Sequence, residues 1–174
     1  MTKILIIHSS VDGHTMHICE RIRSFREDLD IDIISLPKTR NISLNKYEMI
    51  IIGASIRYGN YRKELFEFID ENINIIHSMK NAFFSVNVVA RKVEKSTPNK
   101  NPYMQKFLAD TSWRPTKKEV FAGKVDYPNY GFFDKNIIRL IMFLTKGPTD
   151  TTRCYEFTDW HRVTKFGNLV SRFK

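Results

Sequence analysis

The fold is decided by the stretch KILIIHSSVDGHT, which runs from Lys3 to Thr15. Its apolar run, residues 4–7, is typical of a buried strand, and a polar turn with one glycine follows it. The next segment, residues 17–29, carries apolar residues at three- and four-residue steps, which is the spacing of one helix face. The chain therefore opens with a strand, a short polar turn and a helix.

The polar turn has the groups needed to bind a phosphate. A helix start offers free backbone N–H groups and the positive end of the helix dipole. Ser9, Ser10 and Thr15 add hydroxyl donors, and Gly13 lets the chain pass close to an anion. The Walker and three-glycine patterns are missing, which favours a monophosphate. An ordinary Asp-Gly turn with Thr15 as helix N-cap explains these residues equally well.

Composition and charge narrow the classes of partner. The chain has 174 residues and a net charge of +9, which suggests an acidic partner or simply solubility. Lysines and arginines are spread along the chain and no nucleic-acid module is visible, so we expect no nucleic-acid partner. Cys19 and Cys154 lie far apart without zinc spacing, so we expect free thiols, a reducing cytoplasm and no metal. We find no secretory signal and no apolar run long enough to span a membrane.

Strands and helices alternate along the chain. We expect strands at residues 4–7, 31–36, 47–54, 81–89 and 119–125. We expect helices at residues 17–29, 63–72, 103–110, 132–146 and 158–173. This predicts one α/β domain, residues 1–174, with a doubly wound five-stranded parallel sheet of order 2-1-3-4-5 and a long insertion around residues 90–115. The ligand then lies at the carboxyl ends of strands one, three and four.

Four segments carry a family resemblance. They are SSVDGHT (9–15), IIGASIRYGNY (51–61), FFSVNVVARKVEKSTP (83–98) and FLADTSWRP (107–115). Together they resemble the flavodoxin-like, quinone-dependent protoporphyrinogen IX dehydrogenases of bacterial haem synthesis, over nearly the whole chain. The last three segments are more specific for this family, because many flavodoxin-like proteins have a phosphate-binding turn like the first segment.

The resemblance implies a cofactor, two substrates and a location. It implies non-covalent FMN, oxidation of protoporphyrinogen IX to protoporphyrin IX, and menaquinone or ubiquinone as acceptor. It also implies a cytoplasmic protein in peripheral contact with the cell inner membrane. The sequence gives neither the oligomeric state nor the choice of quinone.

Matching the segments also implies which residues hold FMN. The phosphate lies on the turn after the first strand, and the ring lies between segments 55–61 and 87–91, with Tyr58 or Tyr61 stacked on it. Asp12 would repel a phosphate, so we expect its side chain to point outward. The implied contacts are Ser9, Ser10, Asp12, Gly13, His14, Thr15, Ser55, Ile56, Arg57, Tyr58, Gly59, Asn60, Tyr61, Ser85, Val86, Asn87, Val88 and Arg91.

The implied substrate carries two propionates, and arginine binds a carboxylate through two parallel hydrogen bonds. The candidates are Arg57, Arg62, Arg91 and Arg114. Arg57 and Arg91 come first because they flank the expected ring site. We assign no catalytic acid or base.

The apolar segment 132–146 allows two interpretations. Lys135, Arg139 and Lys146 fall on one stripe of a helix that is otherwise broadly apolar. Such a helix suits an interface with anionic lipids, and it equally suits a helix that covers the sheet.

Two rival functions fit the same fold. One is an NAD(P)H:quinone reductase, but no second nucleotide motif is visible. The other is an electron-carrier flavodoxin, but such carriers are usually acidic and this chain is basic.

Overall fold

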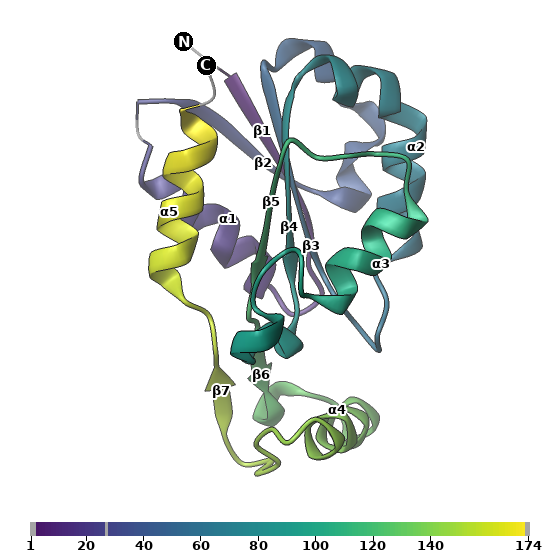
Figure 1. Ribbon diagram of the computed structural model, residues 1–174, viewed down its shortest axis with the longest axis vertical. Coiled ribbons are helices and arrows are strands. Elements are labelled where there is room, and N and C mark those ends of the chain that lie inside the picture. The colour runs from purple at the N-terminus through teal and green to yellow at the C-terminus, as the bar shows by residue number, and fades with distance from the viewer. Residues whose placement is uncertain (1–2, 27, 173–174) are drawn as a thin grey trace.

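A five-stranded parallel sheet with strand order β2-β1-β3-β4-β5 runs through the centre of the molecule (Figure 1). The computed structural model describes residues 3–26 and 28–172. The strands are β1 (Lys3–Ser9), β2 (Asp30–Ser35), β3 (Met49–Ser55), β4 (Lys80–Val86) and β5 (Lys117–Phe121). The predicted flavodoxin-like sheet is confirmed.

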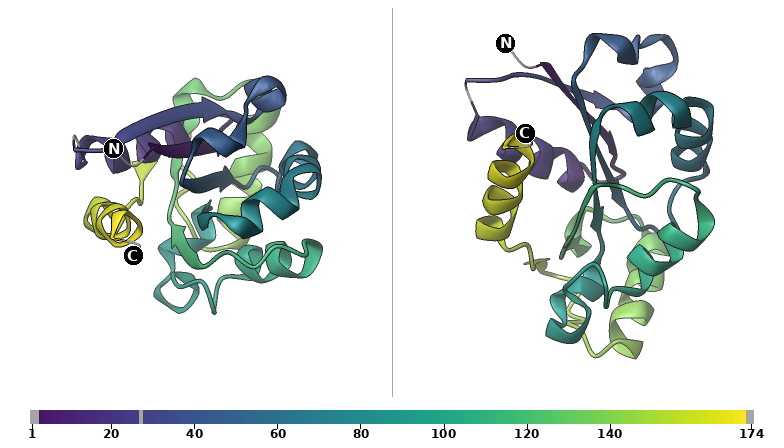
Figure 2. Two further views of the ribbon diagram at one scale, coloured as in Figure 1. Left: turned by 90° about the horizontal axis from the view of Figure 1, so that it is seen from above. Right: turned by 45° about the horizontal axis from the view of Figure 1, so that its top comes forward.

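Helices cover both faces of the sheet (Figure 2). One face carries α1 (His14–Ser24) and α5 (Trp160–Ser171), and the other carries α2 (Lys63–Ser78) and α3 (Pro102–Asp110). Neighbouring strand residues belong to opposite cores: Ile51 packs with the α1 and α5 side, and Ile52 with the α2 side. This explains the uninterrupted apolar runs, since both faces of the strand are buried.

The first helix begins earlier and ends earlier than its apolar spacing predicts. Gly13 is the N-cap, in the left-handed region at φ 81°, so the alternative with Thr15 as cap is wrong. The helix ends at Ser24 because the chain turns there, and Phe25 is its C-cap. Residue 27 of the predicted helix, and Phe173 of the predicted last helix, lie outside the described residues.

The insertion around residues 90–115 has regular structure. It holds short 3-10 helices, η3 (Val88–Arg91) and η4 (Val93–Lys95), and then α3. The fully buried Asn101 holds these pieces together, because its amide donates to Asn87 Oδ1 at 3.0 Å and to the Lys95 carbonyl at 2.9 Å. The predicted strand 81–89 ends at Val86, where Asn87 caps η3. Further 3-10 helices are η1 (Leu36–Asn41), η2 (Leu44–Lys46) and η5 (Tyr127–Asn129).

The predicted fifth strand, residues 119–125, is wrong as one element. Strand β5 ends at Phe121, and β6 (Lys124–Asp126) pairs antiparallel with β7 (Cys154–Glu156), which lies beside a segment predicted as loop. Gly123 separates β5 from β6, and its carbonyl accepts from Phe157 N at 3.1 Å.

Helix α4 (Phe132–Leu144) lies between β6 and β7 in the chain, beyond the carboxyl ends of the sheet strands (Figure 1). Met142 is its buried residue, and most of its other apolar side chains are exposed. The alternative in which this helix covers the sheet is therefore wrong.

Candidate active site

A cavity of about 270 Å³ opens at the carboxyl ends of the strands. The turn after β1, the loop after β3 and the segment after β4 form three of its walls, and the β6 region forms the fourth. Its lining residues are Ser10, Val11, Asp12, His14, Thr15, Ser55, Ile56, Arg57, Val86, Asn87, Val88, Gly123, Lys124, Asp126, Asn129 and Tyr130. This is the topological switch point at which doubly wound sheets bind ligands.

The turn between β1 and α1 holds unsatisfied hydroxyl groups. Ser9 is only 2% exposed, and the buried Oγ atoms of Ser9 and Ser10 have no hydrogen-bond partner among the described residues. Most buried polar groups in folded proteins are paired, so two unpaired hydroxyls in one turn indicate a missing partner. The start of α1 and the left-handed Gly13 lie in the same turn, and together these groups suit an anion.

His14 ties this turn to the segment before α5. Its Nε2 lies 2.6 Å from Thr158 Oγ1, and the Thr158 hydroxyl donates to the Ala122 carbonyl at 2.9 Å. Because that hydroxyl has a single proton, His14 Nε2 must be the donor in its own bond. Burial lowers the pKa of His14 below its usual value. The histidine is therefore neutral at pH 7, with Nδ1 unprotonated.

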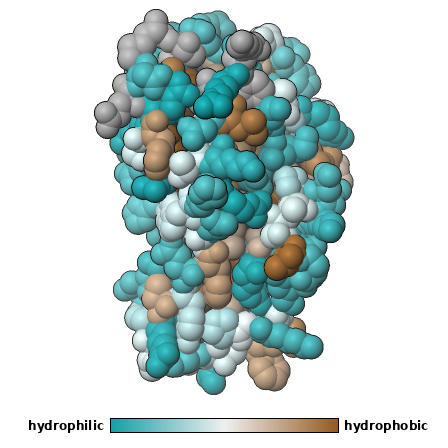
Figure 3. Space-filling view, turned by 60° about the vertical axis from the view of Figure 1, so that its left-hand side comes forward, coloured by the Kyte–Doolittle hydropathy of each residue, from teal (hydrophilic) through white to brown (hydrophobic). Residues whose placement is uncertain are grey.

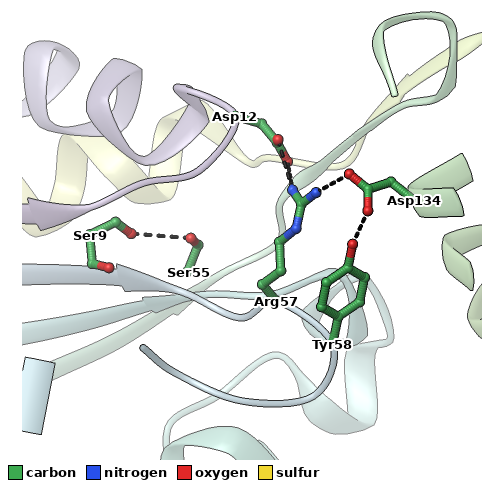
Figure 4. Close-up of polar contacts among 6 residues, drawn as sticks. All are labelled: Ser9, Asp12, Ser55, Arg57, Tyr58 and Asp134. Carbon is green, nitrogen blue, oxygen red and sulfur yellow. Dashed lines mark hydrogen bonds and ion pairs between the residues drawn. The ribbon is translucent and has the colours of Figure 1, made fainter. Parts of the chain in front are cut away.

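Arg57 joins three elements at the cavity mouth (Figure 4). Its guanidinium contacts the Asp12 carboxylate at 2.9 Å and the Asp134 carboxylate of α4 at 2.5 Å. The Tyr58 hydroxyl also donates to Asp134. Nearby, Ser55 Oγ donates to the Ser9 carbonyl at 3.1 Å, which connects the loop after β3 with the turn after β1.

A smaller cavity of about 120 Å³ adjoins the first and reaches α4. Tyr58 and Gly59 form part of it, together with apolar side chains of α4 and of the segment after β4. Its lining residues are Asp12, Ile56, Arg57, Tyr58, Gly59, Asn87, Val88, Val89, Tyr103, Lys124, Val125, Tyr130, Ile138, Ile141 and Met142.

Several residues expected at the site lie elsewhere in the described structure. Tyr61 is buried in the core between Phe83 and Phe107, where burial raises the pKa of its phenol, and its hydroxyl donates to Ser85 Oγ at 2.7 Å. Asn60 closes the tight turn with Arg57 through two backbone bonds.

The other three expected substrate arginines also lie outside the linings of both cavities. Arg91 donates to the carbonyls of Val88 and Thr145, at 3.0 and 2.8 Å. Arg114 donates to the Thr111 carbonyl at 2.6 Å, and Arg62 is the exposed N-cap of α2.

Most of the lining residues that sequence reasoning missed lie between residues 123 and 142, and the others are Val11, Val89 and Tyr103. The chief ones are Gly123, Lys124, Asp126, Asn129, Tyr130, Ile138, Ile141 and Met142. The available signal was Gly123, because a glycine inside an apparent strand often marks a break in the ladder. Reading the chain through it as one strand hid the loop that brings these residues to the site.

Comparison with known proteins decides the family. The family model described as a flavodoxin domain matches residues 5–152. The chain belongs to the flavodoxin-domain family. Within it, the chain is 39% identical over 171 residues to the protoporphyrinogen IX dehydrogenase (quinone) of Escherichia coli strain K12, covering 97% of this chain and 94% of the relative. A Leishmania major protein of the same name is 38% identical over 169 residues, covering 95% and 73%.

Solved flavodoxin structures support the fold. Oxidised flavodoxin 1 from Bacillus cereus gives a TM-score of 0.53 at 15% identity, covering 99% of both chains. A short-chain flavodoxin associated with a bacterial microcompartment also gives 0.53, at 11% identity, covering 99% of this chain and 98% of that one. At these identities the likeness to the flavodoxins concerns the fold alone.

The described residues contain no group of three or more His, Cys, Asp or Glu side chains placed to hold a metal ion. None of their helices combines the length and the hydropathy that a membrane-spanning helix requires.

Proposed function

We propose that this flavodoxin-domain protein is an FMN-dependent oxidoreductase that converts protoporphyrinogen IX into protoporphyrin IX and passes the electrons to a membrane quinone, as a step of haem synthesis. The observation that carries this proposal is the pair of buried, unpartnered hydroxyls of Ser9 and Ser10, where β1 leads into the turn before α1, in a chain 39% identical to enzymes of that name. An NAD(P)H:quinone reductase remains the rival to be tested.

The residues of the larger cavity fit FMN. Ser10 and Thr15 line the cavity and offer hydroxyls to the phosphate, the buried Ser9 hydroxyl lies directly before them at the end of β1, and the start of α1 offers backbone N–H groups. Asp12 is held by Arg57, which neutralises a carboxylate that would repel the phosphate. The ring then lies between the loop after β3 and the segment after β4, beside Ile56 and Asn87. When bound, FMN supplies the two-electron redox chemistry, and the protein positions the reactants.

Arg57 is the first candidate for a propionate of the substrate, because it lines both cavities. Its present partners are carboxylates, so a propionate can replace Asp134 without changing the chemistry of the contact. Arg91 is the second candidate, and binding there requires it to leave the Thr145 carbonyl. Arg62, the exposed N-cap of α2, stays a candidate near the loop after β3, whereas Arg114 precedes β5 at the end of the sheet opposite the cavity. We expect Arg57→Ala with Arg91→Ala to raise the apparent KM for protoporphyrinogen IX; an unchanged KM would refute the assignment.

Helix α4 carries the membrane contact in this proposal. Phe132, Phe133, Phe143 and Leu144 are 70–79% exposed, whereas the face over α1 and α5 is mainly hydrophilic with scattered hydrophobic side chains (Figure 3). A cluster of exposed aromatic and aliphatic side chains marks a surface that meets a membrane or a protein. Lys135, Arg139 and Lys146 on the same segment favour anionic lipids.

The membrane contact is tested by sedimentation with vesicles. We expect the protein to pellet with vesicles of anionic lipid at low salt and to be released at high salt. Phe132→Ser with Phe133→Ser should abolish the pelleting, while Phe25→Ser, an exposed aromatic beside α1, should not. No pelleting of the unaltered protein at low salt would contradict the proposal.

The reaction is tested by anaerobic mixing. FMN-loaded protein is mixed with protoporphyrinogen IX, and then a quinone is added. We expect loss of the flavin absorbance in the first step and its return in the second. Reduction of the flavin by NADPH instead of protoporphyrinogen IX would establish the rival function. A protein that binds no FMN would refute both functions.

A further inference from the structure

We propose that the groove between the outer edge of β5 and helix α5 is a docking site for an acidic, extended segment of a partner protein. The groove has a volume of about 650 Å³, and in the described structure it shares no lining residue with the two cavities above. Helix α5 flanks the sheet, whereas α4 lies beyond the carboxyl ends of the strands (Figure 1). This inference therefore goes beyond the proposed redox function and does not depend on it.

The lining of the groove is basic. Its charged side chains are four cations and, among the described residues, one carboxylate: Lys118, Arg162, Lys165, Arg172 and Glu119. Arg162 pairs with Glu119 at 2.5 Å, so the negative charge is neutralised inside the groove. Lys165 and Arg172 are exposed and form no ion pair with another described residue. Two uncompensated cations thus favour an anionic partner.

The basic side chains follow the length of α5. His161, Lys165 and Arg172 are spaced by four and by seven residues, so they share one face of the helix. At about 1.5 Å per residue, the helix rises about 16 Å from the first to the last of them. An extended chain of about five residues covers the same length. Leu169 lies among these residues and is 50% exposed, which adds an apolar contact.

The outer edge of β5 is placed to pair with such a chain. Among the described strands, β5 pairs only with β4. Alternate residues of a strand point their N–H and C=O groups to the same edge. The Phe121 carbonyl accepts from Asn87 N at 3.1 Å on the β4 side, so the backbone groups of Lys118 and Val120 point outward.

The Glu119 carboxylate already accepts from Val120 N at 2.8 Å. The N–H and C=O groups of Lys118 are then the ones placed for an added strand, which is how extended peptides dock on sheet edges.

Main-chain pairing distinguishes a peptide from other polyanions. Single-stranded nucleic acids stack their bases on exposed aromatic rings. Phe166 is the Phe, Tyr or Trp side chain of this lining in the described structure, and it is only 3% exposed. A bilayer contacts projecting side chains, whereas this groove is recessed between a helix and a strand. An acidic peptide matches both the charge and the strand edge.

The experiment uses peptides of defined charge and backbone. Fluorescence anisotropy at low salt measures the binding of labelled Glu-Val-Glu-Val-Glu-Val to the protein in the presence of FMN. The peptide Glu-Pro-Glu-Pro-Glu-Pro has the same charge but lacks alternate backbone N–H groups. The peptide Lys-Val-Lys-Val-Lys-Val has the reversed charge.

One double variant tests the groove, and a second one is its control. Lys165→Glu with Arg172→Glu reverses the two uncompensated cations. Lys46→Glu with Lys100→Glu changes the net charge equally, at two exposed lysines outside the groove. Circular dichroism checks that both variants are folded, and the comparison of peptides on the unaltered protein needs neither of them.

We expect the Glu-Val peptide to bind, with an affinity about tenfold or more lower in the groove variant and within about twofold of the unaltered protein in the control. The Glu-Pro peptide should bind about tenfold or more weaker than the Glu-Val peptide, and the Lys-Val peptide should not bind. Hydrogen exchange at the Lys118 amide, followed by NMR, should slow when the Glu-Val peptide is bound.

Three outcomes with the peptides would overturn the proposal: no binding of the Glu-Val peptide at low salt, equal affinity for the Glu-Pro peptide, or unchanged affinity in the groove variant. Competition is the last test. An oligothymidylate of about six nucleotides, or vesicles of anionic lipid, that displaced the peptide from the groove with equal affinity would assign it to nucleic acid or to a membrane instead.

Discussion

Arg57 of the loop after β3 and Asp134 of α4 form an ion pair at 2.5 Å, and Figure 4 shows it beside the hydrogen bond from Tyr58 to the same carboxylate. The same guanidinium holds Asp12, so one side chain connects the phosphate turn with the helix proposed to meet the membrane. Both partners are partly buried, with 20% and 33% of the side chain exposed, so solvent weakens the pair only in part.

Replacing Asp134 should loosen α4. In Asp134→Asn we expect amide hydrogen exchange in residues 132–144 to quicken about fivefold, because a partly buried, charge-assisted contact contributes about 1 kcal/mol. Mass spectrometry of peptides from α4 measures this change. Asp150→Asn removes an exposed carboxylate that pairs with Arg153 and should leave α4 unchanged. Equal exchange in all three proteins would show that the pair does not hold the helix.

The serines of the phosphate turn should affect stability and binding differently. Ser9→Ala and Ser10→Ala each remove a buried hydroxyl without a partner among the described residues. We therefore expect the free energy of unfolding of the FMN-free protein to stay equal or to rise by up to about 1 kcal/mol. FMN affinity should fall about tenfold for each, because a charge-assisted hydrogen bond contributes about 1.5 kcal/mol.

Riboflavin distinguishes loss of a phosphate contact from general damage to the serine variants. It lacks the phosphate, so its affinity should not change in either variant. Quenching of flavin fluorescence measures both ligands. Equal losses of affinity for FMN and for riboflavin would refute the assignment of the FMN phosphate to this turn.

Gly53 should not tolerate a side chain. A Cβ built on this residue of β3 would overlap the ring of Phe84, its partner in β4. In Gly53→Ala the interior must shift, and we expect the free energy of unfolding to fall by about 3 kcal/mol. Phe84→Leu in the same chain should recover part of this loss, as urea unfolding would show. A Gly53→Ala protein of unaltered stability would contradict this packing.

Stability should depend on pH through two histidines. Burial lowers the pKa of both His8 and His14 in the folded protein. The unfolded chain then binds more protons just below the ordinary histidine pKa of about 6.5, so the free energy of unfolding rises with pH there and falls on acidification. Carboxylates whose pKa is lowered in the folded protein, such as Asp32, change the free energy of unfolding only at more acidic pH.

This dependence is measured by urea unfolding of the FMN-free protein at about pH 5.5 and about pH 7.5, on either side of the histidine pKa. We expect lower stability at the lower pH, and a smaller difference in His14→Gln, which cannot take up a proton. His77→Gln is the matched control, because His77 lies exposed at the end of α2. Equal stability at the two pH values would exclude the effect.

The sheet and its order could be predicted because the apolar runs and the turn after β1 are local signals. Ile51 and Ile52 face opposite cores, and a run of such residues identifies a doubly covered strand without any knowledge of its neighbours. The segments around Ser10, Arg57 and Asn87 were likewise placed at one cavity by topology alone.

The features of the fold and the site that were not predicted depend on long-range contacts, which no local sequence pattern encodes. Tyr61 follows the loop after β3 directly, yet its ring lies in the aromatic core because Phe83 and Phe107 surround it. Asp134 is separated from Arg57 by 77 residues, and only the excursion through β6 brings the two together. Strand β7 is three residues long and pairs, among the described strands, only with β6, so it has too few residues for a recognisable alternation of apolar and polar side chains.

The two ends of that excursion meet at the hydrogen bond from Phe157 N to the Gly123 carbonyl. Residues 124–156 therefore leave the sheet and return to the same place, so insertions, deletions or replacements within them need not disturb the strand order. Exchanging this one appendage would therefore change the cavity walls that it supplies and the exposed surface of α4, while the five-stranded sheet keeps its strand order.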